Sequence, residues 1–90
     1  MEFEDTVTIL NRLGLHARPA ARFAQKASEF NADVWLVKDG KKVDGKNILE
    51  VLTLVCPRGS ILTVRAVGSD SNQAVTELKT LVENHFGELD

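Results

Sequence analysis

The sequence has little that would place it among disulfide-bonded, membrane or nucleic-acid-binding proteins. It holds a single cysteine, Cys56, so no disulfide can form within the chain, which suits a reducing cytosol. No apolar run approaches the ~18 residues of a membrane span. Residues 2–5 are mostly acidic, unlike the basic start of a signal peptide. We therefore expect a cytoplasmic protein with no direct membrane insertion.

Other signals are also scarce. The net charge of −2 gives no basis for bulk nucleic-acid binding. There is no repeat, linker or low-complexity segment, and there is neither a glycine-rich phosphate loop nor a cluster of metal-ligating residues. Hydrophobic residues make up 43% and charged residues 27%, which is ordinary for a globular protein. The sequence predicts one domain over residues 1–90, with no metal and no cofactor.

Strands are predicted where apolar and polar residues alternate. They cover residues 3–10, 34–37, 41–44 and 61–67. Asp39 and Gly40, between the second and third strands, are typical of a two-residue hairpin turn of type I′. Trp35 would point away from the core if its neighbours Val34 and Leu36 point inward.

Two long helices and one short helix are predicted from apolar residues at three- and four-residue spacing. The first covers residues 17–29. The short one starts at Asn47, a good N-cap, and Glu50 completes a variant of the capping box. It ends by about residue 55, because a proline and a glycine follow. The last helix is capped by the turn at residues 68–71 and ends at Gly87. Its expected buried stripe is Ala74, Val75, Leu78, Leu81 and Val82.

The predicted order of elements is β-α-β-β-α-β-α. Strands with one apolar face need a cover, and amphipathic helices supply it. We therefore expect an α+β fold in which an antiparallel sheet carries helices on one face and meets water on the other.

The heptapeptide Gly-Leu-His-Ala-Arg-Pro-Ala, from Gly14 to Ala20, is the most informative feature. Pro19 lacks an N–H and suits the first helical position, and Gly14 allows a tight entry with positive φ. His16 is thus expected just before a helix, where free N–H groups and the positive helix end favour anions. An imidazole there can receive a phosphoryl group, whose oxygens Arg18 and the helix end can hold.

This heptapeptide resembles the active-site signature of HPr, the histidine phosphocarrier of the bacterial phosphoenolpyruvate:sugar phosphotransferase system. The preceding Asn11-Arg12-Leu13 resembles nitrogen-branch relatives somewhat more closely. The similarity extends over about residues 3–86 in length and order of elements. It implies an HPr-like open-faced sandwich, with a four-stranded antiparallel sheet and three helices on one face.

The resemblance also implies a mechanism. His16 would take a phosphoryl group from phospho-enzyme I, itself charged by phosphoenolpyruvate, and pass it to a histidine of an enzyme IIA domain. Nδ1 would be the reacting atom, Arg18 would stabilise the oxygens in transfer, and the N–H groups of Ala17 and Arg18 would bind the phosphate. The chain would be a monomeric carrier and a substrate of phosphotransferase-system enzymes, not an enzyme itself, and would need no cofactor.

Partner docking needs an apolar patch near His16, and the resemblance points to aliphatic side chains beside it and on the short helix. These are Leu15, Ile48, Leu49 and Leu52. Some of them must instead belong to the core. Arg22 and Lys26 would extend a basic stripe from Arg18 towards an acidic partner, although a solvated helix face is the simpler interpretation.

Asn47 occupies the position at which Gram-positive members of the family carry a regulatory serine. Asparagine caps a helix as well as serine does, but it has no hydroxyl to phosphorylate. We therefore interpret Asn47 as a helix cap and not as a regulatory site.

Three functions stay open at this point. The first is a phosphocarrier, and the second is a regulatory, nitrogen-branch type of member that acts on partners through its phosphorylation state. The third is a small metal- or nucleotide-binding domain, which the missing glycine-rich loop disfavours. His16 favours the first. Cys56 is expected to be a small buried residue, and His85 a cation that suits the end of the last helix.

Overall fold

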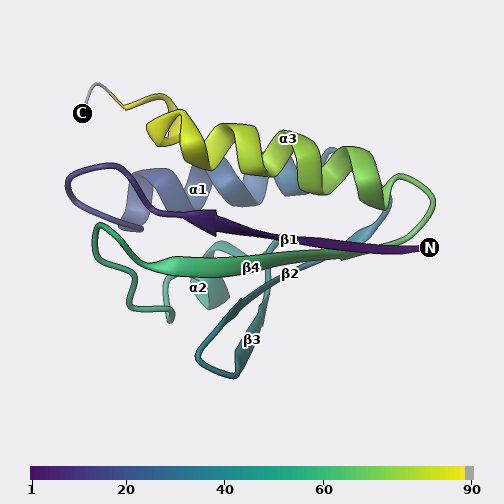
Figure 1. Ribbon diagram of the computed structural model, residues 1–90, viewed down its shortest axis with the longest axis horizontal. Coiled ribbons are helices and arrows are strands. Elements are labelled where there is room, and N and C mark those ends of the chain that lie inside the picture. The colour runs from purple at the N-terminus through teal and green to yellow at the C-terminus, as the bar shows by residue number, and fades with distance from the viewer. Residues whose placement is uncertain (89–90) are drawn as a thin grey trace.

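A four-stranded antiparallel sheet with helices over one face forms the molecule (Figure 1). The computed structural model describes residues 1–88. The strands are β1 (Glu2–Thr8), β2 (Asp33–Lys38), β3 (Lys41–Asp44) and β4 (Ile61–Val67), in the spatial order β1-β4-β2-β3. The helices are α1 (Ala17–Ala27), α2 (Ile48–Val51) and α3 (Ser71–Glu83), and a short 3-10 turn, η1, follows at His85–Gly87. The predicted fold class and order of elements are confirmed.

The sheet buries one face, as the alternation predicted. Leu36 of β2 pairs with Val64 of β4 on one side and with Val43 of β3 on the other, and all three are buried. Trp35, the neighbour of Leu36, lies on the opposite face, half-buried under the Lys42 ammonium at 4.4 Å from the ring centroid. The helices cover the apolar face because their own buried stripes need the same contact.

The stripe predicted on α3 is buried except at one position. Ala74, Val75, Leu78 and Val82 are at most 1% exposed. Leu81 is only partly buried and packs at the edge of the core.

The ends of all three helices differ from the predicted ones. The first helix ends at Ala27, and tighter turns follow, with the Glu29 N–H bonded to the Lys26 carbonyl and the Phe30 N–H to the Ala27 carbonyl. The short helix ends at Val51 and continues as tighter turns, with the Thr53 N–H bonded to the Glu50 carbonyl.

The last helix ends at Glu83, four residues before the predicted end at Gly87. His85, Phe86 and Gly87 all have positive φ, at 58°, 54° and 80°. Phe86 is 1% exposed, so its side chain is in the core and the backbone turns sharply to place it there. β1 likewise ends at Thr8, although the predicted strand continued to Leu10.

Candidate functional site

The loop before α1 holds His16 by contacts with the segment after α2. Gly14 has φ +73°, and a Cβ there would lie 2.3 Å from the Cys56 carbonyl oxygen, so only glycine fits. The next residue, Leu15, donates its N–H to that same carbonyl at 2.9 Å. His16 follows as the N-cap of α1 with extended backbone angles. Its position therefore depends on two loops packed against each other.

Among the described residues, two N–H groups at the start of α1 have no acceptor. The first intrahelical bond runs from the Ala20 N–H to the His16 carbonyl at 3.0 Å. Pro19 was predicted at the first helical position, but it is the third residue of α1. Proline is tolerated there because the N–H groups of the first turn have no acceptor within the helix. Within residues 1–88, the N–H groups of Ala17 and Arg18 have no protein acceptor. Both lie directly after His16 and point outward from the positive helix end.

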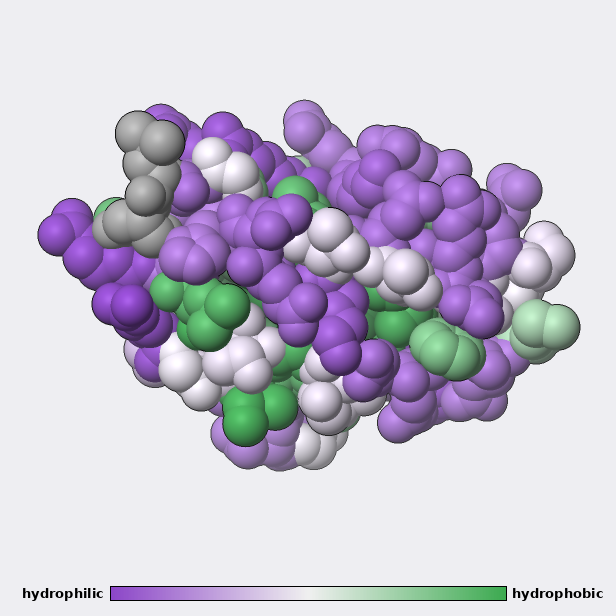
Figure 2. Space-filling view, turned by 45° about the horizontal axis from the view of Figure 1, so that its top comes forward, coloured by the Kyte–Doolittle hydropathy of each residue, from purple (hydrophilic) through white to green (hydrophobic). Residues whose placement is uncertain are grey.

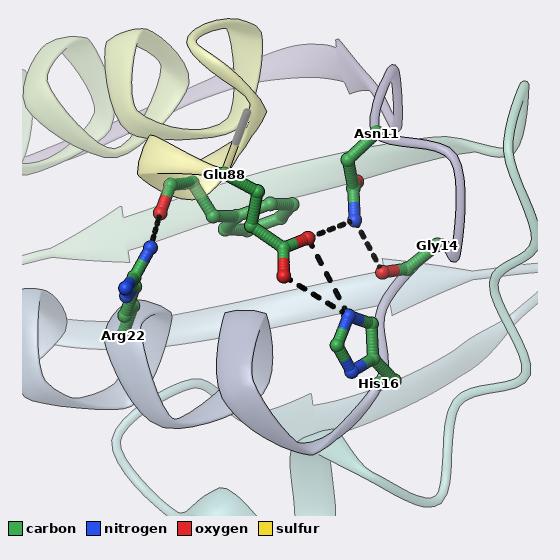
Figure 3. Close-up of polar contacts among 6 residues, drawn as sticks. Asn11, Gly14, His16, Arg22 and Glu88 are labelled. Carbon is green, nitrogen blue, oxygen red and sulfur yellow. Dashed lines mark hydrogen bonds and ion pairs between the residues drawn. The ribbon is translucent and has the colours of Figure 1, made fainter. Parts of the chain in front are cut away.

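The imidazole of His16 contacts a carboxylate that the sequence analysis did not single out. Its Nε2 lies 3.2 Å from Oε2 and 3.4 Å from Oε1 of Glu88 (Figure 3). The buried amide of Asn11 donates from Nδ2 to Oε1 of Glu88 at 2.9 Å and to the Gly14 carbonyl at 2.7 Å. No sequence pattern links Glu88 to His16, since 72 residues separate them.

Arg18 is exposed and makes no hydrogen bond or ion pair within the described part of the chain. Its guanidinium is therefore free to bind an anion at the start of α1. Its own charge opposes the positive helix end, so Arg18 does not stabilise α1 through the helix dipole.

The basic stripe predicted along α1 is largely occupied by contacts within the protein. Arg22 donates from Nη1 to the Phe86 carbonyl. Lys26 forms ion pairs with Glu77 at 2.9 Å and Glu29 at 3.3 Å. The hydrogen bond to Glu77, and then that to Glu29, raises the pKa of Lys26 above its usual value.

Of the apolar residues predicted for docking, Leu15 and Leu52 line the same hollow as His16, whereas Ile48 and Leu49 do not line it. Leu49 is 73% exposed, and Ile48 and Leu52 are partly exposed beside it. Leu15 is only 7% exposed and belongs to the core. The hydrogen bond from its N–H to the Cys56 carbonyl holds this residue against the loop after α2.

Two further apolar residues, which the sequence analysis did not select, lie at this surface. Leu13 is 65% and Val55 79% exposed. Figure 2 shows apolar areas in green on this side of the molecule, including some near its left end, where Figure 1 places the loop before α1. An open hollow beside the histidine is lined by Leu13, Leu15, His16, Ala17, Leu52, Leu54, Val55, Cys56 and Pro57.

Asn47 caps α2, as predicted. Its Oδ1 accepts from the N–H groups of Leu49 at 3.0 Å and Glu50 at 3.2 Å. The capping box does not form, because the Asn47 N–H is already bonded to the Asp44 carbonyl at 3.1 Å. The Glu50 carboxylate instead accepts the Asp44 N–H at 3.0 Å.

The remaining candidates lie outside this chemistry. Cys56 is buried, and burial raises the pKa of its thiol. His85 lies in the turn after α3 and not within the helix. In residues 1–88, no three His, Cys, Asp or Glu side chains group closely enough to hold a metal ion. No helix in that range has the length and apolar character to cross a membrane.

Comparison with known proteins decides the family. Residues 3–84 match the family described as "PTS HPr component phosphorylation site". The chain belongs to the HPr family.

Two relatives illustrate the similarity in sequence. HPr of Neisseria meningitidis serogroup A is 35% identical over 85 residues, which cover 94% of this chain and 96% of that one. The HPr-like protein Crh of Bacillus subtilis is 40% identical over 80 residues, covering 89% of this chain and 94% of Crh.

Solved structures agree with the fold. A crystal structure of HPr from Thermoanaerobacter tengcongensis has a TM-score of 0.91 at 43% identity and covers 96% of this chain and 97% of that one. The same HPr has also been solved as a dimer, with a TM-score of 0.77 over 91% of this chain and 94% of that one, at 43% identity. HPr proteins are phosphocarriers of the phosphotransferase system, and His16 lies within the matched phosphorylation-site family.

Proposed function

We propose that this protein carries a phosphoryl group on Nδ1 of His16, receives it from phospho-enzyme I and passes it to a histidine of an enzyme IIA domain. The observation that carries the proposal is the start of α1. There the imidazole lies beside the N–H groups of Ala17 and Arg18 and the Arg18 guanidinium, none of which has a partner within residues 1–88. These donors fit the oxygens of a phosphoryl group.

In each transfer the lone pair of the accepting nitrogen forms a bond to phosphorus. The bond between phosphorus and the donor nitrogen breaks, and the donor ring keeps that electron pair. One phosphorus–nitrogen bond replaces another, so the protein has to position the two rings and stabilise the charge on the phosphoryl oxygens during transfer. A reducing cytoplasm, where the single buried cysteine stays reduced, is the compartment that we propose.

Docking of both partners would use the exposed apolar side chains around His16. An apolar patch next to the reacting atom is typical of a binding surface. Leu13, Leu52 and Val55 line the hollow at His16, and the exposed Ile48 and Leu49 of α2 would extend this surface. A regulatory member of the family would use the same site, with its phosphorylation state as the signal.

The proposal is tested by incubating the protein with phosphoenolpyruvate and enzyme I and measuring its intact mass. We expect the mass of one phosphoryl group on the wild type, lost in acid and kept in base, and none on His16→Ala. His85→Ala is the matched control and should be labelled fully. Full labelling of a folded His16→Ala protein would reject the assignment.

A further inference from the structure

The contact between Glu88 and His16 is partly open to solvent. Both side chains are partly accessible, at 14% for Glu88 and 36% for His16. The carboxylate nevertheless places both oxygens within 3.4 Å of Nε2 (Figure 3).

The same turn that buries Phe86 also brings Glu88 to His16. Three successive residues with positive φ, His85 to Gly87, reverse the chain after α3 and direct it towards the start of α1. Two of the three are not glycine, and such conformations persist only where the surroundings impose them. Here Phe86 is buried in the core, and its carbonyl accepts a hydrogen bond from Arg22 of α1.

The hydrogen bonds define where the imidazole proton lies. The Gly14 carbonyl can only accept, so the Asn11 atom bonded to it is Nδ2. The same Nδ2 donates its second hydrogen to Oε1 of Glu88. An ionised carboxylate has no donor and can only accept hydrogen bonds. Facing such a carboxylate, Nε2 of His16 is the atom that donates, and in a neutral ring the lone pair is then on Nδ1.

We propose that Glu88 is a positioning residue, which keeps the proton on Nε2 and so leaves Nδ1 of His16 as the nucleophile. The inference rests on the proposed function. When the Nδ1 lone pair bonds to phosphorus, the ring becomes positively charged, and the carboxylate next to Nε2 compensates that charge. When the phosphoryl group leaves, the ring takes back the electron pair and is again neutral with its proton on Nε2. No proton has to move in either direction.

The test is the tautomer of His16, read from the imidazole ¹⁵N signals of the unphosphorylated protein. In the wild type we expect the neutral ring to be protonated at Nε2 alone. In Glu88→Gln both tautomers should appear, because an amide can donate to Nε2 as well as accept from it. Glu83→Gln removes the same charge from an exposed position and should leave the tautomer unchanged.

The rate of phosphorylation by enzyme I provides the second readout. We expect Glu88→Gln to lower kcat about three- to tenfold, as loss of one partly exposed charge-assisted hydrogen bond would. KM and the unfolding midpoint should stay unchanged. A single tautomer in Glu88→Gln, or a changed tautomer with an unchanged rate, would overturn the inference. The tautomer does not depend on enzyme I, so failure of the carrier function itself would show separately, as absence of labelling on the wild type.

Discussion

Gly14 determines how the chain enters α1, since both its φ of +73° and the nearby Cys56 carbonyl exclude a side chain. We expect Gly14→Ala to lower the free energy of unfolding by more than about 2 kcal/mol, because the left-handed conformation alone costs about 1–2 kcal/mol and a clash with backbone is added. Urea denaturation measures the change.

Gly40→Ala separates the two contributions. Gly40 has φ +81°, but nothing lies within 4 Å of the position of its Cβ. This variant should lose only the conformational part, about 1–2 kcal/mol. Equal losses at both positions would show that the close approach of Cys56 to Gly14 does not matter.

Arg18 should contribute to transfer and not to folding. Because its guanidinium is exposed and unpaired within residues 1–88, Arg18→Ala should leave the unfolding midpoint the same or slightly higher, as a cation leaves the positive helix end. The rate of phosphoryl transfer should fall about tenfold to a hundredfold, as expected for a charge-assisted hydrogen bond felt in the transition state. Rapid-quench kinetics with enzyme I measure it.

Arg18→Lys provides the control for charge. Lysine keeps the cation but loses the planar fork that binds two oxygens together. An intermediate rate supports direct contact with the phosphoryl group. Wild-type rates for both variants would remove Arg18 from the site.

At the scale of elements, α2 depends on its cap because it is only four residues long. Asn47→Ala removes the acceptor of two backbone N–H groups, and we expect it to cost about 1 kcal/mol of the free energy of unfolding. Thermal denaturation checks this. Transfer from enzyme I should slow as well, since the helix presents Ile48 and Leu49.

Asn47→Asp separates the effect of losing the helix cap from the effect of changing the surface beside α2. Aspartate keeps a good cap, so stability should be retained while a negative charge appears beside the apolar patch. Slower transfer at unchanged stability would support docking on α2. If neither Asp nor Ala alters transfer, docking does not involve this helix.

Asp70 joins the start of α3 to the start of β2. It occupies the N-cap position of α3 but makes no side-chain cap there, contrary to the capping turn that the sequence predicted. Its carboxylate instead accepts the N–H groups of Asn31 at 2.9 Å and Ala32 at 2.8 Å. These hydrogen bonds, that of Asn31 first, lower the pKa of Asp70 below 3.8.

A carboxyl group whose pKa is lower in the folded than in the unfolded state stabilises the fold. This stabilisation is complete at pH values above the unfolded-state pKa and is lost as the pH falls through the folded-state pKa. Asp70→Asn should therefore unfold more easily than the wild type at about pH 7. The difference should stay constant down to about pH 5 and shrink below 3.8. Denaturant titrations over this range measure it. Asp33→Asn, at the exposed first residue of β2, is the control for removing a negative charge at about pH 7.

The whole molecule should be a monomer of 9.9 kDa. The sheet has two edges, β1 and β3. β1 carries Glu2, Glu4 and Asp5, and β3 has only four residues, of which three are charged. Short, charged edges oppose pairing with another sheet. Sedimentation at several micromolar concentrations checks the mass, and a dimer like the one known for a relative would contradict the expectation.

Much of the architecture could be predicted from the sequence because it depends on neighbours along the chain. Strand faces follow from alternation, the turn at Asp39 and Gly40 has the positive φ values of 51° and 81° that a type I′ hairpin needs, and Asn47 caps the residues directly after it. The helix ends were less predictable, since they depend on which bonds close the last turn and, for α3, on the burial of Phe86.

The same distinction holds for the site. By itself the sequence determined that His16 precedes a helix with Arg18 in its first turn, because bonds within four residues decide where a helix starts. Only the tertiary structure decided that Leu15 is buried, that Glu77 neutralises Lys26, and that Glu88 contacts His16. Each of these depends on segments distant in sequence, which meet only when the core closes, and no local pattern encodes which side chains then face one another.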